Sequence, residues 1–80
     1  MDYGVTTDMV VTYDAFADEV SHAAGLLYAA YIDAERTGQG AWADRLGAAV
    51  AQVWQDNTDV TYEDIPAHRE ALRALVEALL

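Results

Sequence analysis

Apolar residues recur every three or four positions along most of this 80-residue chain, a spacing that places them on one face of a helix. The clearest stripe in the first half is Phe16, Val20, Ala23, Leu27 and Ala30 or Tyr31. Gly38 follows this stripe, and a glycine in the left-handed conformation commonly ends a helix. The pattern therefore predicts a helix over residues 13–37.

Two shorter stripes follow in the second half of the chain. The first of them contains Trp42, Leu46, Ala49, Val50 and Val53. The other contains Ile65, Leu72, Leu75, Val76 and Leu79. Pro66 suits the first turn of a helix, because its missing N–H group has no helical partner there. We expect helices over 41–55 and 64–79, joined by turn residues at 56–59.

The first eleven residues have a different composition from the rest. They combine a glycine, two threonines and three valines, which favour an extended chain over a helix. Thr12 is then the expected N-cap of the first helix. These features predict a single all-α domain, a small three-helix bundle with antiparallel neighbours and a short extended or flexible N-terminal arm over 1–11.

A short sequence motif, Val-Thr-Tyr followed by an acidic residue, occurs at residues 11–14 and again at residues 60–63. We interpret both copies as helix entrances in which the valine and tyrosine pack above a capping threonine. A small pseudo-symmetric motif is the alternative. Thr61 and Asp64 also have the spacing of a capping box, with aspartate in place of the usual glutamate or glutamine.

The chain carries fourteen carboxylates against four arginines, contains no lysine, and has a formal net charge of −10. Such a surface repels nucleic-acid phosphates and anionic lipid, and it accelerates encounters with basic proteins. We therefore expect a basic protein partner, no direct nucleic-acid binding and no membrane binding. Two of the arginines, Arg69 and Arg73, are expected to pair with Glu70 and Glu77 on their own helix.

The sequence contains no apolar run long enough to span a membrane, which needs about 18 residues. Its N-terminus also lacks the charged and then apolar pattern of a secretion signal. These two features favour a cytoplasmic location. Cysteine is absent, which excludes disulfides, thiolate metal sites and thiol catalysis.

The two histidines are the residues most suited to chemistry. His22 lies one turn from Asp18 and close to Glu19, a set that could hold a divalent ion, although we favour a solvated histidine with acidic neighbours. For His68 we expect a partly buried ring, hydrogen-bonded to a backbone carbonyl or a tyrosine hydroxyl, with a pH-sensitive interface contact as the alternative. We expect no catalytic residues, no metal site and no cofactor, and thus not an enzyme; a site assembled between chains is the alternative.

The chain has more large aromatic side chains than the single apolar face of each helix in a small bundle can bury. Tyr28 and Ile32 lie beside the first stripe, and Trp54 borders the second. Tyrosine and tryptophan are favoured at interfaces because each combines a large apolar area with one polar group. The predicted partner-binding residues are Tyr28, Tyr31, Ile32, Trp54, Asp14, Asp18 and Glu19.

Together these features favour a small acidic protein-binding module that binds and inhibits or neutralises a larger basic partner, as antitoxins, immunity proteins and phage-encoded inhibitors do. In size, charge and helical make-up the chain is similar to the colicin immunity proteins, although it shares no motif with them. One alternative is a self-associating scaffold or assembly subunit, including a homodimer through Tyr28, Ile32 and Trp54. Another is a DNA-mimic inhibitor of a nucleic-acid-binding protein.

Overall fold

The computed structural model describes residues 7–80, and this range folds as a small all-α three-helix bundle, as predicted. Its elements are α1 (Thr7–Arg36), α2 (Gly40–Asp56), the short 3-10 helix η1 (Tyr62–Asp64) and α3 (Ile65–Leu79). The molecule is elongated, with extents of 57 × 17 × 17 Å. This shape follows from α1, because a helix of 30 residues is about 45 Å long.

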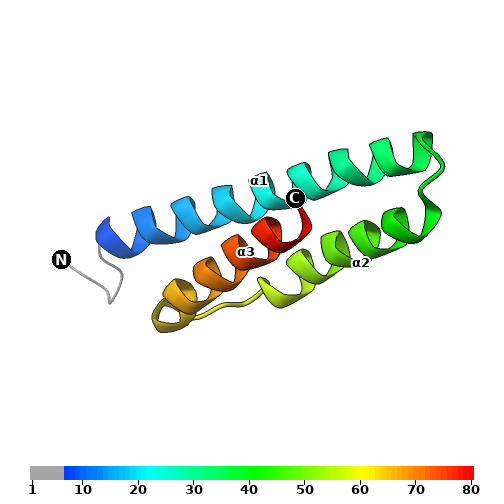
Figure 1. Ribbon diagram of the computed structural model, residues 1–80. Helices are drawn as coiled ribbons and strands as arrows, with labels where there is room; N and C mark the ends of the chain where they lie inside the picture. The colour runs from blue at the N-terminus through cyan, green and yellow to red at the C-terminus, as the bar shows by residue number, and fades with distance from the viewer. Residues whose placement is uncertain (1–6) are drawn as a thin grey trace.

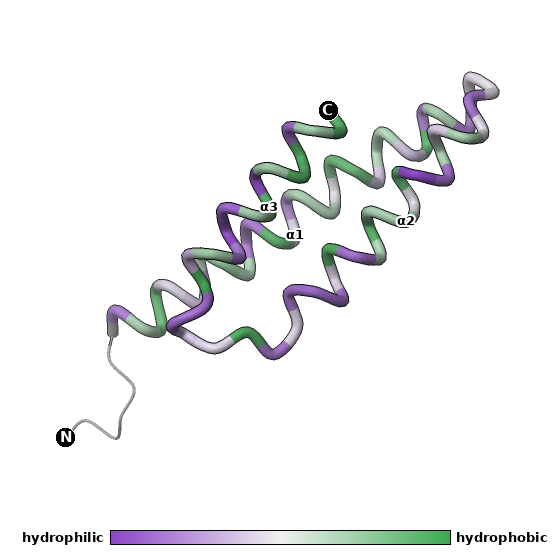
Figure 2. The backbone as a smooth tube through the Cα atoms, turned by 60° about the horizontal axis from the view of Figure 1, so that its bottom comes forward, coloured by the Kyte–Doolittle hydropathy of each residue, from purple (hydrophilic) through white to green (hydrophobic). Residues whose placement is uncertain are grey.

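α1 is the helix on which the other two pack (Figure 1). α2 returns antiparallel along the second half of α1, whereas α3 runs in the same direction as α1 along its first half. Figure 2 shows α1 flanked by α3 and α2. Each end of the molecule is therefore built mainly from two helices.

Among the described residues, the fully buried side chains are all apolar. On α1 they are Phe16, Val20, Ala23, Ala24, Leu27 and Ala34, on α2 they are Ala43, Leu46, Ala49 and Val53, and on α3 they are Ile65 and Leu72. Many of these side chains are alanines, which allow α1 and α2 to approach closely. At Gly47 the space is used by the Tyr31 ring, whose Cε1 atom lies 3.4 Å from where a β-carbon would be.

α1 begins at Thr7, so the predicted N-cap at Thr12 is wrong and the predicted arm over 1–11 is too long. Residues 1–6 of that arm lie outside the described residues. The early start goes with tertiary packing, because Thr12 is partly buried and lines a groove together with Ile65 and Pro66 at the start of α3. Asp8 also lies in the first turn, where a carboxylate stabilises the positive end of the helix dipole. These interactions outweigh the weak helix preference of the valines.

In the connection between α1 and α2, Gly38 adopts the left-handed conformation with a φ of 74°, as predicted for a glycine that ends a helix. At the end of α2, Asn57 Nδ2 donates to the Val53 carbonyl over 2.7 Å, and Thr58 Oγ1 donates to the Trp54 carbonyl over 2.6 Å. These bonds satisfy carbonyl groups that have no partner within the helix. The polar side chains of the turn therefore hold this connection against α2.

Asp59 and Thr61 direct the chain from this turn into η1. Asp59 has a φ of 59°, a left-handed conformation that aspartate tolerates better than most residues. The Thr61 hydroxyl then donates to Asp64 Oδ2 over 2.9 Å, so the predicted capping-box pair does meet. The contact joins the two side chains, and neither of them caps a backbone N–H group.

Candidate protein-binding surface

A groove lies where the first half of α1 meets the end of α2 and the connection to η1. Its lining includes Tyr13, Asp14, Phe16, Ala17, Val20, Ser21, Trp54, Asp59 and Val60. Three of the lining residues are large aromatics, namely Tyr13, Phe16 and Trp54, and two are carboxylates, Asp14 and Asp59. We refer to this site as the acidic aromatic groove.

Trp54 is the largest exposed side chain of the groove, with 49% of its surface accessible. Asp14 and Asp59 are also exposed, and neither side-chain carboxylate forms an ion pair or hydrogen bond with another residue in the described range 7–80. The groove therefore combines a half-exposed indole ring with two carboxylates that have no positively charged partner among residues 7–80.

Tyr28 and Ile32 continue this surface along α1. Their side chains are 54% and 37% exposed. Because successive helical residues are rotated by about 100°, Tyr28 and Ile32 fall on nearly the same side of α1 as Ser21, which lines the groove. We call the three exposed side chains Tyr28, Ile32 and Trp54 the aromatic strip.

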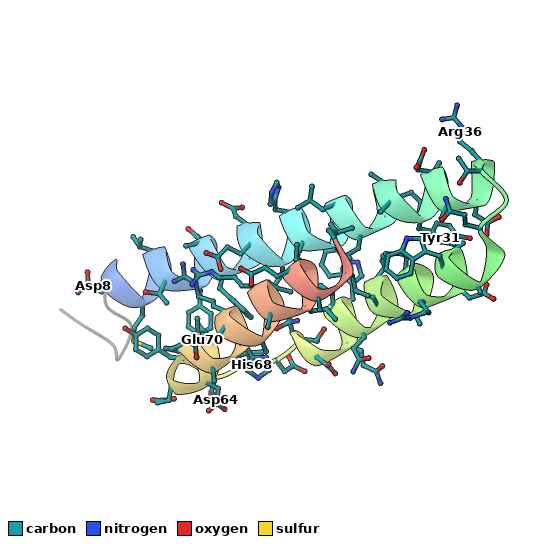
Figure 3. All side chains as sticks on the ribbon, in the orientation of Figure 1. Asp8, Tyr31, Arg36, Asp64, His68 and Glu70 are labelled. Atoms are coloured by element: carbon teal, nitrogen blue, oxygen red, sulfur yellow. The ribbon has the colours of Figure 1, made fainter. Side chains whose placement is uncertain are left out.

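Tyr31 supports the strip from beneath. Its ring centroid lies 5.8 Å from that of Tyr28, and Figure 3 shows the side chain between α1 and α2. The Tyr31 ring is half-buried, which differs from the open exposure of Tyr28. The Glu35 carboxylate raises the pKa of the Tyr31 hydroxyl above its ordinary value, because the hydrogen bond to Glu35 favours the protonated phenol.

Glu19, another predicted partner-binding residue, is engaged within the molecule. Arg69 Nε donates to Glu19 Oε2 over 2.9 Å, and Arg69 Nη2 donates to Glu19 Oε1 over 2.6 Å. Arg73 Nη2 lies 3.6 Å from the same Oε1 atom. The prediction that these arginines pair with Glu70 and Glu77 on their own helix is therefore wrong, because a carboxylate on α1 takes both.

The pairing sets the ionisation of Glu19. Hydrogen bonding from Arg69 lowers the pKa of the Glu19 carboxyl, partial burial opposes that effect, and the charges of Arg69 and Arg73 lower it further. The same pairing raises the pKa of Arg69. Asp18, the neighbouring predicted residue, is exposed on α1 and does not line the groove.

The two histidines differ in burial and contacts. His68 is partly buried, as predicted, but its Nδ1 atom lies 3.1 Å from Asn57 Oδ1 and not against a backbone carbonyl or a tyrosine. Since Asn57 Nδ2 already donates to a carbonyl, its Oδ1 accepts, and His68 Nδ1 carries the proton. The ring also meets Phe16 edge-on at 6.3 Å. His22 is exposed on α1.

Metal ligands do not gather in the part of the chain that the structure covers. Over residues 7–80, no three histidine, aspartate or glutamate side chains come together in a way that could hold a metal ion. The alternative of an ion held by Asp18, Glu19 and His22 thus finds no support in these residues.

The structure brings together only part of the predicted set. Asp14 and Trp54 share the groove, and Tyr28, Tyr31 and Ile32 form the surface beyond it. Two further groove residues, Tyr13 and Asp59, were not predicted as binding residues. Tyr13 belongs to the repeated Val-Thr-Tyr motif, which was interpreted only as a helix entrance.

Comparison with known protein families, with characterised proteins and with solved structures finds no match for this chain. Within residues 7–80, no helix combines the length and the apolar character that crossing a bilayer requires.

Proposed function

We propose that this protein is a small acidic protein-binding module that binds a larger basic protein and inhibits or neutralises it. The observation that carries the proposal is the exposure of Tyr28, Ile32 and Trp54 in the aromatic strip, with Trp54 sharing a groove with the unpaired carboxylates Asp14 and Asp59. Tyrosine and tryptophan are enriched at protein interfaces relative to the rest of the surface.

The charge of the chain indicates the chemistry of the partner. At a net charge of −10, the protein attracts basic surfaces over a distance and repels acidic ones. Two of the four arginines, Arg69 and Arg73, form ion pairs with Glu19, so their charges are neutralised within the molecule. The aromatic strip would then supply the short-range contact that keeps the encounter complex together.

Self-association through the same strip is the second candidate, because a second copy could also cover Tyr28, Ile32 and Trp54. The like charge of two copies opposes this pairing, whereas it favours a basic partner. A DNA mimic ranks lower, since it needs carboxylates in line along one face. The carboxylates of α1 are instead spread over about 200° around the helix, given the rotation of about 100° per residue.

The proposal is tested by capturing the partner from the cells that make this protein and rebuilding the complex from purified components. We expect a complex of fixed stoichiometry with a basic protein, an affinity that falls steeply with salt, and loss of the partner's own activity within the complex. Light scattering of the pure protein tests the alternative. A dimer that dissociates in the Ile32→Asp variant, together with no binding of a basic protein, would contradict the proposal.

Leu26→Asp is the matched control for Ile32→Asp. Leu26 is 41% exposed on α1 but lies beside α3, where it lines a groove with Leu72 and Val76. The two variants make the same change in charge on different sides of one helix. Only Ile32→Asp should weaken the complex, and circular dichroism verifies that both variants remain helical.

A further inference from the structure

Trp54 and Trp42 stand near opposite ends of α2 and have different neighbours. At Trp42, the guanidinium of Arg45 lies over the ring, 5.3 Å from its centroid. This contact is a cation–π interaction between residues three positions apart on the same helix. At Trp54 the corresponding positions are Asn57 and Thr58, which bond to carbonyls at the end of α2. The Trp54 ring therefore has no arginine of its own helix above it.

None of the four arginines is directed to the acidic aromatic groove. Arg45 covers Trp42, and Arg69 and Arg73 bind Glu19. Arg36 projects away from the bundle at the far end of α1 (Figure 3). Asp14 and Asp59 consequently share one groove without a positive group from residues 7–80. Two carboxylates in one groove repel each other, and a cation from outside would relieve that repulsion.

The groove has the combination of groups that suits a guanidinium ion. A planar guanidinium can stack on an indole face while its N–H groups donate to carboxylates at its edges. An ammonium ion satisfies the carboxylates equally well but gains less from the flat ring. The apolar residues that also line the groove, including Ala17 and Val60, suit the methylene stem of a long basic side chain.

From this arrangement we infer that the acidic aromatic groove receives an arginine side chain of the basic partner, stacked on Trp54 and bound by Asp14 and Asp59. The inference rests on the proposed function, and it names the chemistry that this part of the interface recognises. The rest of the aromatic strip, Tyr28 and Ile32, then covers the partner surface next to that arginine.

The test uses the full chain with a capped oligoarginine peptide and an oligolysine peptide of the same length as probes, titrated by calorimetry. The groove variant is Asp14→Asn/Asp59→Asn, and the matched control is Asp33→Asn/Asp44→Asn. Both double variants change the net charge equally, so any difference in affinity comes from position. Asn at position 59 keeps the left-handed turn, because asparagine also tolerates that conformation.

We expect the wild-type chain to bind oligoarginine more tightly than oligolysine. The groove variant should lose about tenfold more affinity for oligoarginine than the control variant, because it removes the two carboxylates that bind the guanidinium and each exposed ion pair contributes modestly. Trp54→Leu should remove the preference for arginine over lysine while keeping the helix. Far-ultraviolet circular dichroism of each variant verifies the fold.

Equal losses in the two double variants would overturn the inference, because binding would then follow net charge alone. That result leaves the proposed function intact, since a basic partner could still be captured elsewhere on the surface. An arginine preference that survives Trp54→Leu would also overturn it. Failure of the proposed function is a separate result, namely the absence of any basic protein in the rebuilt complex.

Discussion

α2 and α3 pack against the same helix through different kinds of contact. α2 contributes the buried side chains Ala43, Leu46, Ala49 and Val53, and it forms no ion pair with α1 among residues 7–80. α3 buries only Ile65 and Leu72 but adds the Arg69–Glu19 pair to α1 and the His68–Asn57 contact to the end of α2. The comparison teaches that specific polar contacts can position a helix whose buried stripe is short.

The largest effect should follow from breaking the α1–α2 contact at Leu46. This side chain is fully buried, so Leu46→Ala should lower the free energy of unfolding by about 2–5 kcal/mol. Leu26→Ala is the control, because Leu26 is exposed and should cost well below that range. Urea denaturation followed by circular dichroism measures both. Equal losses would show that the apolar α1–α2 contact is not the main source of stability.

A smaller loss is expected at the polar link between α2 and α3. Asn57→Ala removes the bond to the Val53 carbonyl and the acceptor for His68, which should cost about 1–2 kcal/mol. Gln52→Ala serves as the comparison, because it removes only an exposed bond to Asp56. Hydrogen exchange should also show faster opening of α3 in Asn57→Ala. If Asn57→Ala and Gln52→Ala had the same stability and the same hydrogen exchange in α3, the Asn57–His68 contact would not position α3.

The Glu19 ion pair should contribute less again, because both partners remain partly exposed. Glu19→Gln should cost at most about 1 kcal/mol at neutral pH. Since folding lowers the pKa of Glu19, the contribution is complete above the unfolded value of about 4.5 and is lost as the pH falls through the lower folded value.

Thermal melts from neutral to acidic pH measure this effect, with Glu70→Gln as the control on α3. The stability difference between wild type and Glu19→Gln should shrink on acidification, whereas that for Glu70→Gln should not follow the same course. If the melting temperatures of wild type and Glu19→Gln fall in parallel, the pair has no pH-dependent role.

The smallest effects are expected at two glycines of the α1–α2 half. At Gly25 a β-carbon would meet no atom within 4 Å, so Gly25→Ala should stabilise the fold by up to about 1 kcal/mol. Gly47→Ala should gain slightly more, because its β-carbon would lie 3.4 Å from the Tyr31 ring, within ordinary van der Waals contact. Melting temperatures distinguish the two. Identical gains would mean that Tyr31 does not rest on Gly47 in solution.

The helical pattern was predictable because it depends on local spacing. The stripes, the left-handed Gly38 and the partly buried His68 all follow from residue type and position. The start of α1 was not predictable in the same way, because the helix preference of the valines is weak and Thr12 meets Ile65 and Pro66, which are far away in the sequence. The two copies of Val-Thr-Tyr also show that a local pattern does not fix a helix start. The copy at 60–62 leads into η1, whereas the copy at 11–13 lies inside α1.

The site was predictable only in part for the same reason. Exposure of Tyr28, Ile32 and Trp54 could be inferred from their positions beside the apolar stripes. Asp14, Trp54 and Asp59 come together only because α2 and the turn after it pack against α1. This packing cannot be predicted from a local sequence pattern. Likewise, Glu19 was available to Arg69 only once α3 had packed beside α1.

The most direct test of the arginine-binding groove is the set of close proton contacts between the Trp54 indole and a bound arginine-bearing partner, measured by isotope-filtered NMR. Trp42 provides an internal reference, because its ring is already covered by Arg45. We predict contacts from the Trp54 ring to the side-chain methylenes of a partner arginine. Contacts confined to other acidic surfaces, with the Trp54 indole unperturbed, would contradict the account.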